Sequence, residues 1–179
     1  MALKATIFKA TLNISDMDRH YYQTHELVIA RHPSETTQRM MLRIIAFALN
    51  ANEDLEFTKG LSTQDEPDLW QKSPASDIEL WIELGQPDEK RIKKACSLST
   101  KAILYSVKNR SFDEWWPQIE PTLTRFNNLS TIAIDPETLD EMADQADRTM
   151  DLTATIQDGQ LWLTLNDKNF EISPHSLIG

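Results

Sequence analysis

Apolar and polar residues alternate along the first part of the chain. Residues 6–14 place an apolar side chain at every second position, which is the period of a strand with one buried face. Residues 15–18 have the composition of a turn, and a second strand is expected near residues 22–31. Two strands joined by so short a turn predict an antiparallel hairpin.

A helical period follows the hairpin. Four apolar residues recur at spacings of three and four and give one apolar face: Met41, Ile44, Ile45 and Ala48. We expect this helix to begin near Pro33–Glu35, because proline is tolerated in a first helical turn and an acid there complements the helix dipole. A short strand is expected at residues 55–58, and the polar residues 62–76 predict a long loop.

Strand and helix patterns alternate in the middle of the chain. Strands are expected at residues 78–84, 102–107 and 129–134, and helices at residues 88–97, 112–119 and 136–146, with Pro121 interrupting the second helix. This alternation predicts a parallel sheet with crossover helices.

The last thirty residues return to a period of two. Residues 152–157 and 161–165 alternate on either side of Asp158–Gly159, a strong hairpin signal, and residues 169–172 suggest one more strand. We therefore expect a mixed α/β fold in a single domain of residues 1–179. Its core spans about residues 33–146, and the N- and C-terminal strands form an antiparallel appendage.

Charge and composition limit the partners. The 179 residues carry a formal net charge of −10, a sign that repels phosphate backbones over most of the surface and argues against a general nucleic-acid binder. A local basic groove remains compatible with it, because salt screens distant charges. A lone cysteine, the lack of a charged-then-apolar leader and the lack of a long apolar run favour the cytoplasm and no membrane partner.

Two acidic residues are candidates for a metal-binding site. Pro67–Asp68 lies in the expected loop, and Glu83 lies at the end of an expected buried strand. A loop followed by a strand can bring both carboxylates to one sheet edge, where oxygen ligands suit a hard divalent cation such as Mg²⁺. Glu35 is a third candidate acid. The structural alternative stays open: a turn aspartate, a strand-end glutamate and a helix N-terminal acid would need no metal.

Several segments spread over nearly the whole chain resemble the YaeQ family. They are Ala30–Thr36, Arg39–Arg43, Phe57–Leu61, Trp81–Gly85, Pro87–Ala95, Asp147–Met150 and Ala154–Gly159. The resemblance implies a fold similar to the PD-(D/E)XK nucleases: a restriction-endonuclease-like core, with a mixed central sheet flanked by helices and an acidic cluster at one edge.

The resemblance also assigns roles to individual residues. Pro67–Asp68 resembles the PD element, Glu83 the first acid of the (D/E)XK element, and Glu35 the helical acid that often completes the site. The family pattern places a lysine two residues after Glu83, where this chain has Gly85. Glycine can neither orient a water molecule nor stabilise phosphate charge. Lys90 or Lys94 on the next helix could reach back to do so, and Gln86 is a weaker substitute.

Two hypotheses about the function follow. In the first, Asp68, Glu83 and Lys90 or Lys94 form the catalytic site of a nuclease or phosphodiesterase. Glu35, Asp68 and Glu83 would then hold Mg²⁺ or Mn²⁺, and nucleic acid would be the substrate. In the second, the lost lysine marks a non-catalytic scaffold that binds nucleic acid or an unidentified protein. A basic stretch is compatible with a phosphate groove or with a solvated helix face: Lys90, Arg91, Lys93, Lys94, Lys101, Lys108 and Arg110.

Overall fold

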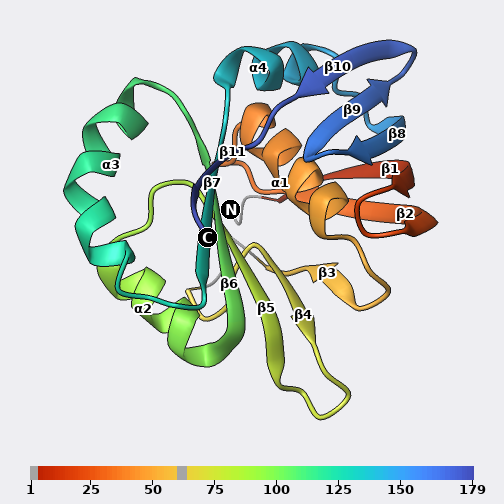
Figure 1. Ribbon diagram of the computed structural model, residues 1–179. Helices are drawn as coiled ribbons and strands as arrows, with labels where there is room; N and C mark the ends of the chain where they lie inside the picture. The colour runs from red at the N-terminus through yellow and green to blue at the C-terminus, as the bar shows by residue number, and fades with distance from the viewer. Residues whose placement is uncertain (1–3, 60–63) are drawn as a thin grey trace. The chain divides into compact units, whose positions relative to one another are not determined.

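The computed structural model describes residues 4–59 and 64–179, which form two compact units (Figure 1). The first unit comprises residues 1–52 and 137–174, and the second comprises residues 53–136 and 175–179. Each unit contains one mixed β-sheet, so the expected mixed α/β class is confirmed. None of the helices in the described residues combines the length and apolar character that a bilayer crossing requires.

The sheet of the first unit has five strands in the order β10-β9-β8-β1-β2. Their bounds are β1 Thr6–Asp16, β2 Tyr21–Arg31, β8 Thr149–Gln157, β9 Gln160–Leu165 and β10 Lys168–Ile172. The two predicted hairpins are confirmed, and Asp158 and Gly159 both have positive φ, as a type I′ turn requires. The N- and C-terminal strands also pair as expected. Their shared seam is parallel, however, with Lys9 opposite Thr149, so the prediction of a purely antiparallel appendage was wrong.

Helix α1 (Thr37–Asn50) belongs to the first unit, as does α4 (Pro136–Asp144) apart from its first residue. The apolar face predicted for α1 is buried, and so are half of its other side chains. The helix begins later than predicted. The side-chain oxygen of Thr36 accepts a hydrogen bond from the Arg39 amide at 3.1 Å, which makes Thr36 the N-cap. Residues 33–35 form a turn before the helix, and the Glu35 amide donates to the His32 carbonyl.

The sheet of the second unit has six strands in the order β11-β7-β6-β5-β4-β3. Their bounds are β3 Leu55–Phe57, β4 Leu69–Lys72, β5 Ile78–Leu84, β6 Ser99–Val107, β7 Leu129–Ile134 and β11 His175–Ile178. The predicted parallel arrangement is confirmed for β5, β6 and β7, and the other three strands pair antiparallel. The expected loop of residues 62–76 instead contains β4; residues 62 and 63 lie outside the described residues.

Two helices pack on the sheet of the second unit, α2 (Glu89–Leu98) and α3 (Arg110–Leu123) (Figure 1). Their apolar residues join Trp81, Leu104 and Leu129 of the strands in one buried cluster. Helix α3 runs through Pro121, so the predicted interruption is wrong. Pro117 and Pro121 are both exposed and lie four residues apart, on one face of the helix. Water can therefore hydrate the carbonyl groups that lose an N–H partner there.

Candidate functional site

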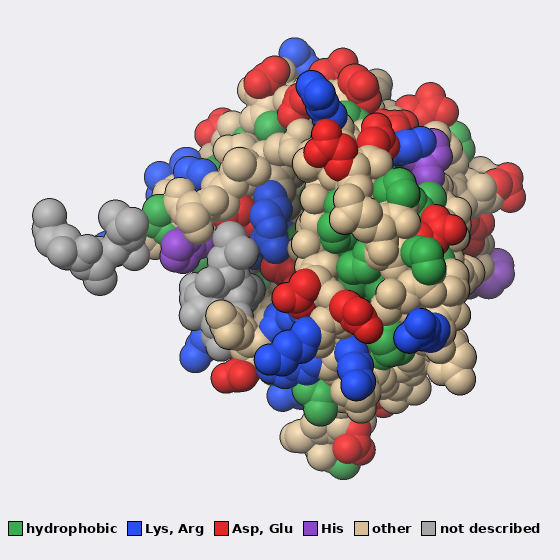
Figure 2. Space-filling model, turned by 90° about the vertical axis from the view of Figure 1, so that its left-hand side faces the viewer, with side chains coloured by type: hydrophobic (Ala, Val, Ile, Leu, Met, Phe, Trp, Pro, Cys, Tyr) green, Lys and Arg blue, Asp and Glu red, His purple; other side chains and the backbone are tan. Residues whose placement is uncertain are grey.

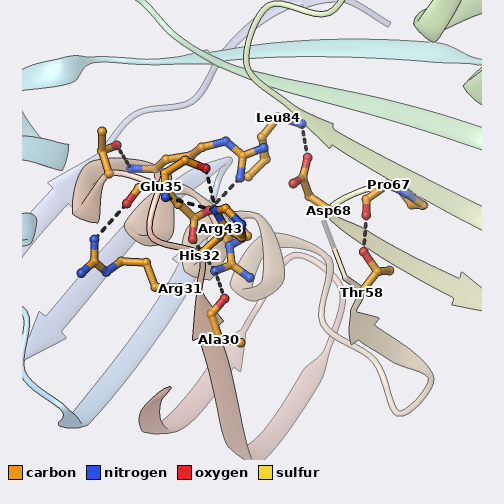
Figure 3. Close-up of polar contacts among 12 residues, drawn as sticks. Ala30, Arg31, His32, Glu35, Arg43, Thr58, Pro67, Asp68 and Leu84 are labelled. Carbon is orange, nitrogen blue, oxygen red and sulfur yellow. Dashed lines mark hydrogen bonds and ion pairs between the residues drawn. The ribbon is translucent and has the colours of Figure 1, made fainter. Parts of the chain in front are cut away.

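Asp68 lies immediately before β4 and is fixed from two sides. Its carbonyl accepts a hydrogen bond from the Thr58 amide at 3.2 Å, and its own amide donates to the Ile82 carbonyl at 3.0 Å. One carboxylate oxygen, Oδ2, accepts the Leu84 amide at 2.9 Å, as Figure 3 shows. The side chain of Thr58 also donates to the Pro67 carbonyl. Asp68 is 4% exposed, so these bonds hold a carboxylate at the end of β5.

Glu83 lies near the end of β5 and shares a face of the strand with Trp81, because strand side chains alternate. The Trp81 indole Nε1 donates to Glu83 Oε1 at 2.9 Å. The Arg91 guanidinium Nε donates to Glu83 Oε2 at 3.1 Å. Only 14% of the Glu83 side chain is exposed. Both oxygens are therefore held in place by hydrogen bonds.

The electrostatic environment of Glu83 links it to Asp68. Burial raises the pKa of Glu83 above its usual range, and the nearby negative charge of Asp68 raises that pKa further. The hydrogen bonds and charge of Arg91 and the hydrogen bond from Trp81 act in the opposite direction without cancelling the rise. The negative charge of Asp68 thus disfavours the ionised form of Glu83.

Arg91 is a cation that contacts Glu83, and the sequence analysis named it only as one member of a basic stretch. It lies in the first turn of α2, where Asp88 caps the helix by accepting the Arg91 amide at 2.8 Å. Besides its bond to Glu83, the guanidinium donates to the carbonyls of Gln64 and Glu66, the latter at 2.7 Å. It also lies over the Trp81 ring, 5.3 Å from the centroid.

The two lysines predicted to replace the missing lysine lie on the same helix. Lys94 is one turn after Arg91, and its amine is 3.3 Å from the Gln64 carbonyl and 3.5 Å from an Asp65 carboxylate oxygen. Lys90 is exposed. The register of α2 explains the difference. Ile92, Ala95 and Cys96 form its buried face, and Arg91 and Lys94 border that face.

The backbone at Gly85 gives a physical reason for the missing lysine. Gly85 has a φ of +102°, a conformation that residues with a Cβ rarely adopt. Its amide donates to the Tyr105 carbonyl at 2.9 Å, and its carbonyl accepts from the Ser106 hydroxyl at 2.7 Å. A Cβ at this position would meet no atom within 4 Å. The local chain conformation, rather than a lack of space, therefore disfavours lysine here.

Glu35 belongs to the first unit, and two arginines of α1 bind its carboxylate. Arg39 Nη1 lies 2.7 Å from Oε2, and Arg43 Nη2 lies 2.6 Å from Oε1. Arg31 also donates to the main-chain carbonyl of Glu35 at 2.9 Å. Figure 3 shows Arg31, Glu35 and Arg43 in this arrangement. The structure thus joins Asp68 with Glu83 and Arg91, and it joins Glu35 with three arginines.

The described residues provide two acids, rather than a larger cluster, for a metal ion. No group of three or more histidine, cysteine, aspartate or glutamate side chains in residues 4–59 and 64–179 is arranged to hold one. The predicted site residues remain predictions, with Asp68 and Glu83 as the pair that the second unit brings together.

Basic side chains gather beside this pair. Figure 2 shows Lys and Arg side chains grouped on the lower part of the visible face, over helix α2. Lys90, Lys93 and Lys101 are exposed, whereas Arg91 and Lys94 are half-buried. Exposed acids lie among these cations, namely Asp65, Asp88 and Glu89, so the surface next to Glu83 carries charges of both signs.

Known proteins match this chain along almost its whole length. The sequence profile of the family described as YaeQ protein matches residues 1–174. The uncharacterized YaeQ protein of Escherichia coli (strain K12) is 48% identical over 173 residues, covering 97% of this chain and 96% of the relative. Its counterpart from Salmonella typhi is also 48% identical, over 172 residues, covering 96% of this chain and 95% of the relative.

Two crystal structures superpose closely on this fold. The YaeQ protein of Xanthomonas axonopodis pv. citri gives a TM-score of 0.94 at 40% identity and covers 98% of this chain and 99% of its own. That of Pseudomonas syringae gives 0.94 at 32% identity and covers 98% and 97%. The profile match, the sequence identity and the shared fold together show that this chain belongs to the YaeQ family.

Proposed function

We propose that Asp68 and Glu83 bind a divalent cation, Mg²⁺ or Mn²⁺, in a site that hydrolyses phosphodiester bonds of nucleic acid. The observation that carries the proposal is that Asp68 Oδ2 accepts the amide of Leu84, the residue after Glu83, which places both acids at the end of β5; the charge of Asp68 also contributes to the raised pKa of Glu83. Functional sites often hold two carboxylates close together, although the proximity makes their ionised forms less favourable. A divalent cation between them would relieve their repulsion.

The donor set fits such a cation. Mg²⁺ prefers oxygen ligands and is often held by one or two carboxylates, with water and substrate phosphates completing the octahedron. Both Glu83 oxygens accept one hydrogen bond each, and a carboxylate oxygen has two lone-pair directions, so it can take a metal ion as a second partner. When bound, the cation would activate a water molecule and neutralise charge on the phosphate.

We assign the role of the missing lysine to Arg91. Its guanidinium orients Glu83 through the 3.1 Å bond and places a permanent positive charge beside the acid pair. The bonds to Glu83, Gln64 and Glu66 use three of its five N–H groups. The exposed lysines of α2 would contact the phosphate backbone further away. The nuclease-like core implied by the family resemblance is part of this proposal, supported by the mixed sheet of the second unit.

Hydrolysis of labelled substrates tests the proposal. Single- and double-stranded DNA and RNA would be incubated with millimolar Mg²⁺ or Mn²⁺, or with EDTA. We expect cleavage that requires metal and is lost in Asp68→Asn and Glu83→Gln. Glu79→Gln, which removes an exposed acid from the same strand, is the matched control and should cleave normally. Failure to cleave any substrate with either metal would refute the catalytic proposal.

A specific observation favours a second candidate, a non-catalytic binding scaffold. The Arg91 guanidinium already faces the Glu83 carboxylate and is anchored by two main-chain carbonyls. A fixed arginine can balance this carboxylate without any metal. This candidate predicts that a nucleic-acid or protein partner binds wild type and Glu83→Gln equally in EDTA, with no cleavage in any condition. Loss of binding in the variant or in EDTA would contradict it.

A further inference from the structure

Strand β2 forms one edge of the five-stranded sheet in the first unit (Figure 1). In the part of the chain that the structure describes, it pairs with β1 alone, in a continuous register from Tyr21 opposite Asp16 to Arg31 opposite Thr6. Sheet edges are usually protected from pairing with another chain by a proline, a bulge or a lysine. The eleven residues of β2 include no proline and no lysine, so this long edge has little of the usual protection.

The main-chain groups of alternate β2 residues point away from β1. On the other side of β1, the Lys9 amide donates to the Arg148 carbonyl at 2.8 Å, so odd-numbered residues of β1 bond β8 and even-numbered ones bond β2. These even-numbered residues lie opposite odd-numbered residues of β2. The even-numbered residues of β2 therefore face the free edge. Arg43 donates to the outward carbonyl of Ala30 at 3.0 Å. Within residues 4–59 and 64–179, four residues find no main-chain partner on that side: Tyr22, Thr24, Glu26 and Val28.

The free edge is complementary to itself in one antiparallel register. When Tyr22 lies opposite Val28 of a second copy, Thr24 lies opposite Glu26 of that copy, and both pairs can exchange main-chain hydrogen bonds. Tyr22 and Val28 are 55% and 62% exposed and lie on the same face of β2. An aromatic and a β-branched side chain directly opposite each other stabilise a strand pair. Two-fold symmetry would form this contact twice.

Charge favours this register over its neighbours. A shift of two residues in one direction places Glu26 opposite Glu26, where like charges destabilise the pair. The same shift in the other direction places Val28 opposite His20, which lies outside β2. In the favoured register, His25 lies opposite its own copy on the side of α1, where its ring contacts Phe47. Burial lowers the pKa of His25, so no positive charges oppose each other there at neutral pH.

We propose that β2 pairs antiparallel with β2 of a second copy, in a symmetric dimer whose ladder spans residues 22–28. The two five-stranded sheets would then form one continuous sheet, with a two-fold axis at His25; symmetric contacts of this kind are the commonest in protein dimers. One strand from each copy makes a small interface, so the dimer should dissociate on dilution. The proposal goes beyond the proposed function, because it needs neither a metal nor the Asp68–Glu83 pair.

Sedimentation of the whole chain over a range of concentrations tests the dimer. We expect wild type to be a monomer when dilute and a dimer when concentrated. Thr24→Pro removes an amide that points to the free edge and does not bond β1, so the fold should be retained. Its dimer should be about ten- to hundredfold weaker, because one ladder hydrogen bond is lost in each copy. Thr24→Ala keeps the amide and is the matched control. Thermal unfolding of the dilute proteins checks that each variant is folded.

A side-chain variant gives an independent test. Val28→Lys places a charge on the edge and should also weaken the dimer. Ile7→Lys changes a residue of β1 that is 41% exposed and lies outside the ladder, so it is the control. A monomer at every concentration would overturn the proposal and leave the edge to a strand of another protein. A dimer whose Kd neither Thr24→Pro nor Val28→Lys changes would also overturn it.

Cross-linking tests the register. Opposite Cα atoms in a pair without mutual hydrogen bonds lie about 4.5 Å apart, a separation that a disulfide can span. His25→Cys should therefore form a disulfide between copies on mild oxidation, and Glu26→Cys should not. Wild type, whose lone Cys96 is buried, is the control. Cross-linking of Glu26→Cys in preference to His25→Cys would refute the proposed ladder.

Discussion

The Glu83→Gln variant tests the electrostatics of the candidate site through protein stability. Glutamine keeps the size of the side chain, but it has one accepting oxygen where Glu83 has two, so it keeps only one of the bonds that Trp81 and Arg91 donate to separate oxygens. It removes the negative charge that burial and Asp68 disfavour. The charge of Arg91 opposes these effects, but the net direction is a raised pKa. The ionised carboxylate is therefore less favourable in the folded protein than in the unfolded chain.

The sign of the pH dependence follows from proton linkage. A carboxyl group whose folded pKa lies above its unfolded value binds protons more tightly when folded. Wild type consequently loses stability as pH rises from below 4.5, the ordinary value for this group, through its raised pKa. Each tenfold difference in proton affinity is worth about 1.4 kcal/mol, and about 1 kcal/mol moves the Tm of a protein this size by about 2–4 °C.

Thermal unfolding of both proteins from acidic to alkaline pH measures this effect. We expect the Tm of Glu83→Gln relative to that of wild type to increase from acidic to alkaline pH, because only wild type acquires the disfavoured charge. Glu79→Gln, an exposed acid on the same strand, should show no such trend. A Glu83→Gln protein that is less stable than wild type, by a margin that grows with pH, would mean that the pair with Arg91 outweighs burial and repulsion.

Three further predictions concern single positions. Gly85→Ala should lower the free energy of unfolding by about 1–2 kcal/mol, because alanine does not readily adopt a φ of +102°; an unchanged midpoint in urea would contradict this. Arg43→Met should cost about 3–5 kcal/mol by the same measurement, because it leaves the buried carboxylate of Glu35 short of a partner, and a loss below about 1 kcal/mol would mean that this pair behaves as an exposed one. Burial raises the pKa of Cys96 to about 11, so at mildly alkaline pH its thiol should react with a disulfide reagent far more slowly in the folded than in the unfolded protein; equal rates would contradict the burial.

Hydrophobic periodicity was sufficient to predict most elements of the second unit. The predicted bounds of β5 and β7 match the structure, because Ile78–Leu84 and Leu129–Ile134 are rich in apolar residues and are followed by Gly85 and by Asp135–Pro136. The alternation of these strands with helices also predicted their parallel order. Strand β4 was missed because only four residues of a polar segment form it, and its pairing with β5 stabilises it.

Information that depends on distant residues was not available from periodicity. An alternating pattern shows which face of a strand is buried and gives no strand direction, so the parallel pairing of β1 with β8 could not be read from it. The start of α1 depended on the cap formed by Thr36. Proline in the last turn of α3 is tolerated because Pro121 is exposed.

The sequence indicated the acidic residues of the candidate site more clearly than its basic residues. Asp68 and Glu83 were paired because a loop followed by a strand can bring both carboxylates to one sheet edge; in the structure Asp68 precedes β4, and its Oδ2 accepts the Leu84 amide at the end of β5. Arg91 had a usable signal: Asp88 as a helix cap fixes the register of α2 and places Arg91 beside the buried face. The partners of Glu35 had a simpler signal, since Arg39 and Arg43 follow it at spacings of four and eight.

The most direct test of the central claim is a titration of Mn²⁺ into wild type, Asp68→Asn and Glu83→Gln, with thermal unfolding as the readout and Glu79→Gln as the control. A cation that binds only the folded protein stabilises it by about 2.7 kcal/mol at a hundredfold excess over its Kd. We predict that wild type and Glu79→Gln are stabilised by the metal and that the two site variants are not. Equal shifts in all four proteins, or no shift in wild type at millimolar metal, would contradict a cation site formed by Asp68 and Glu83.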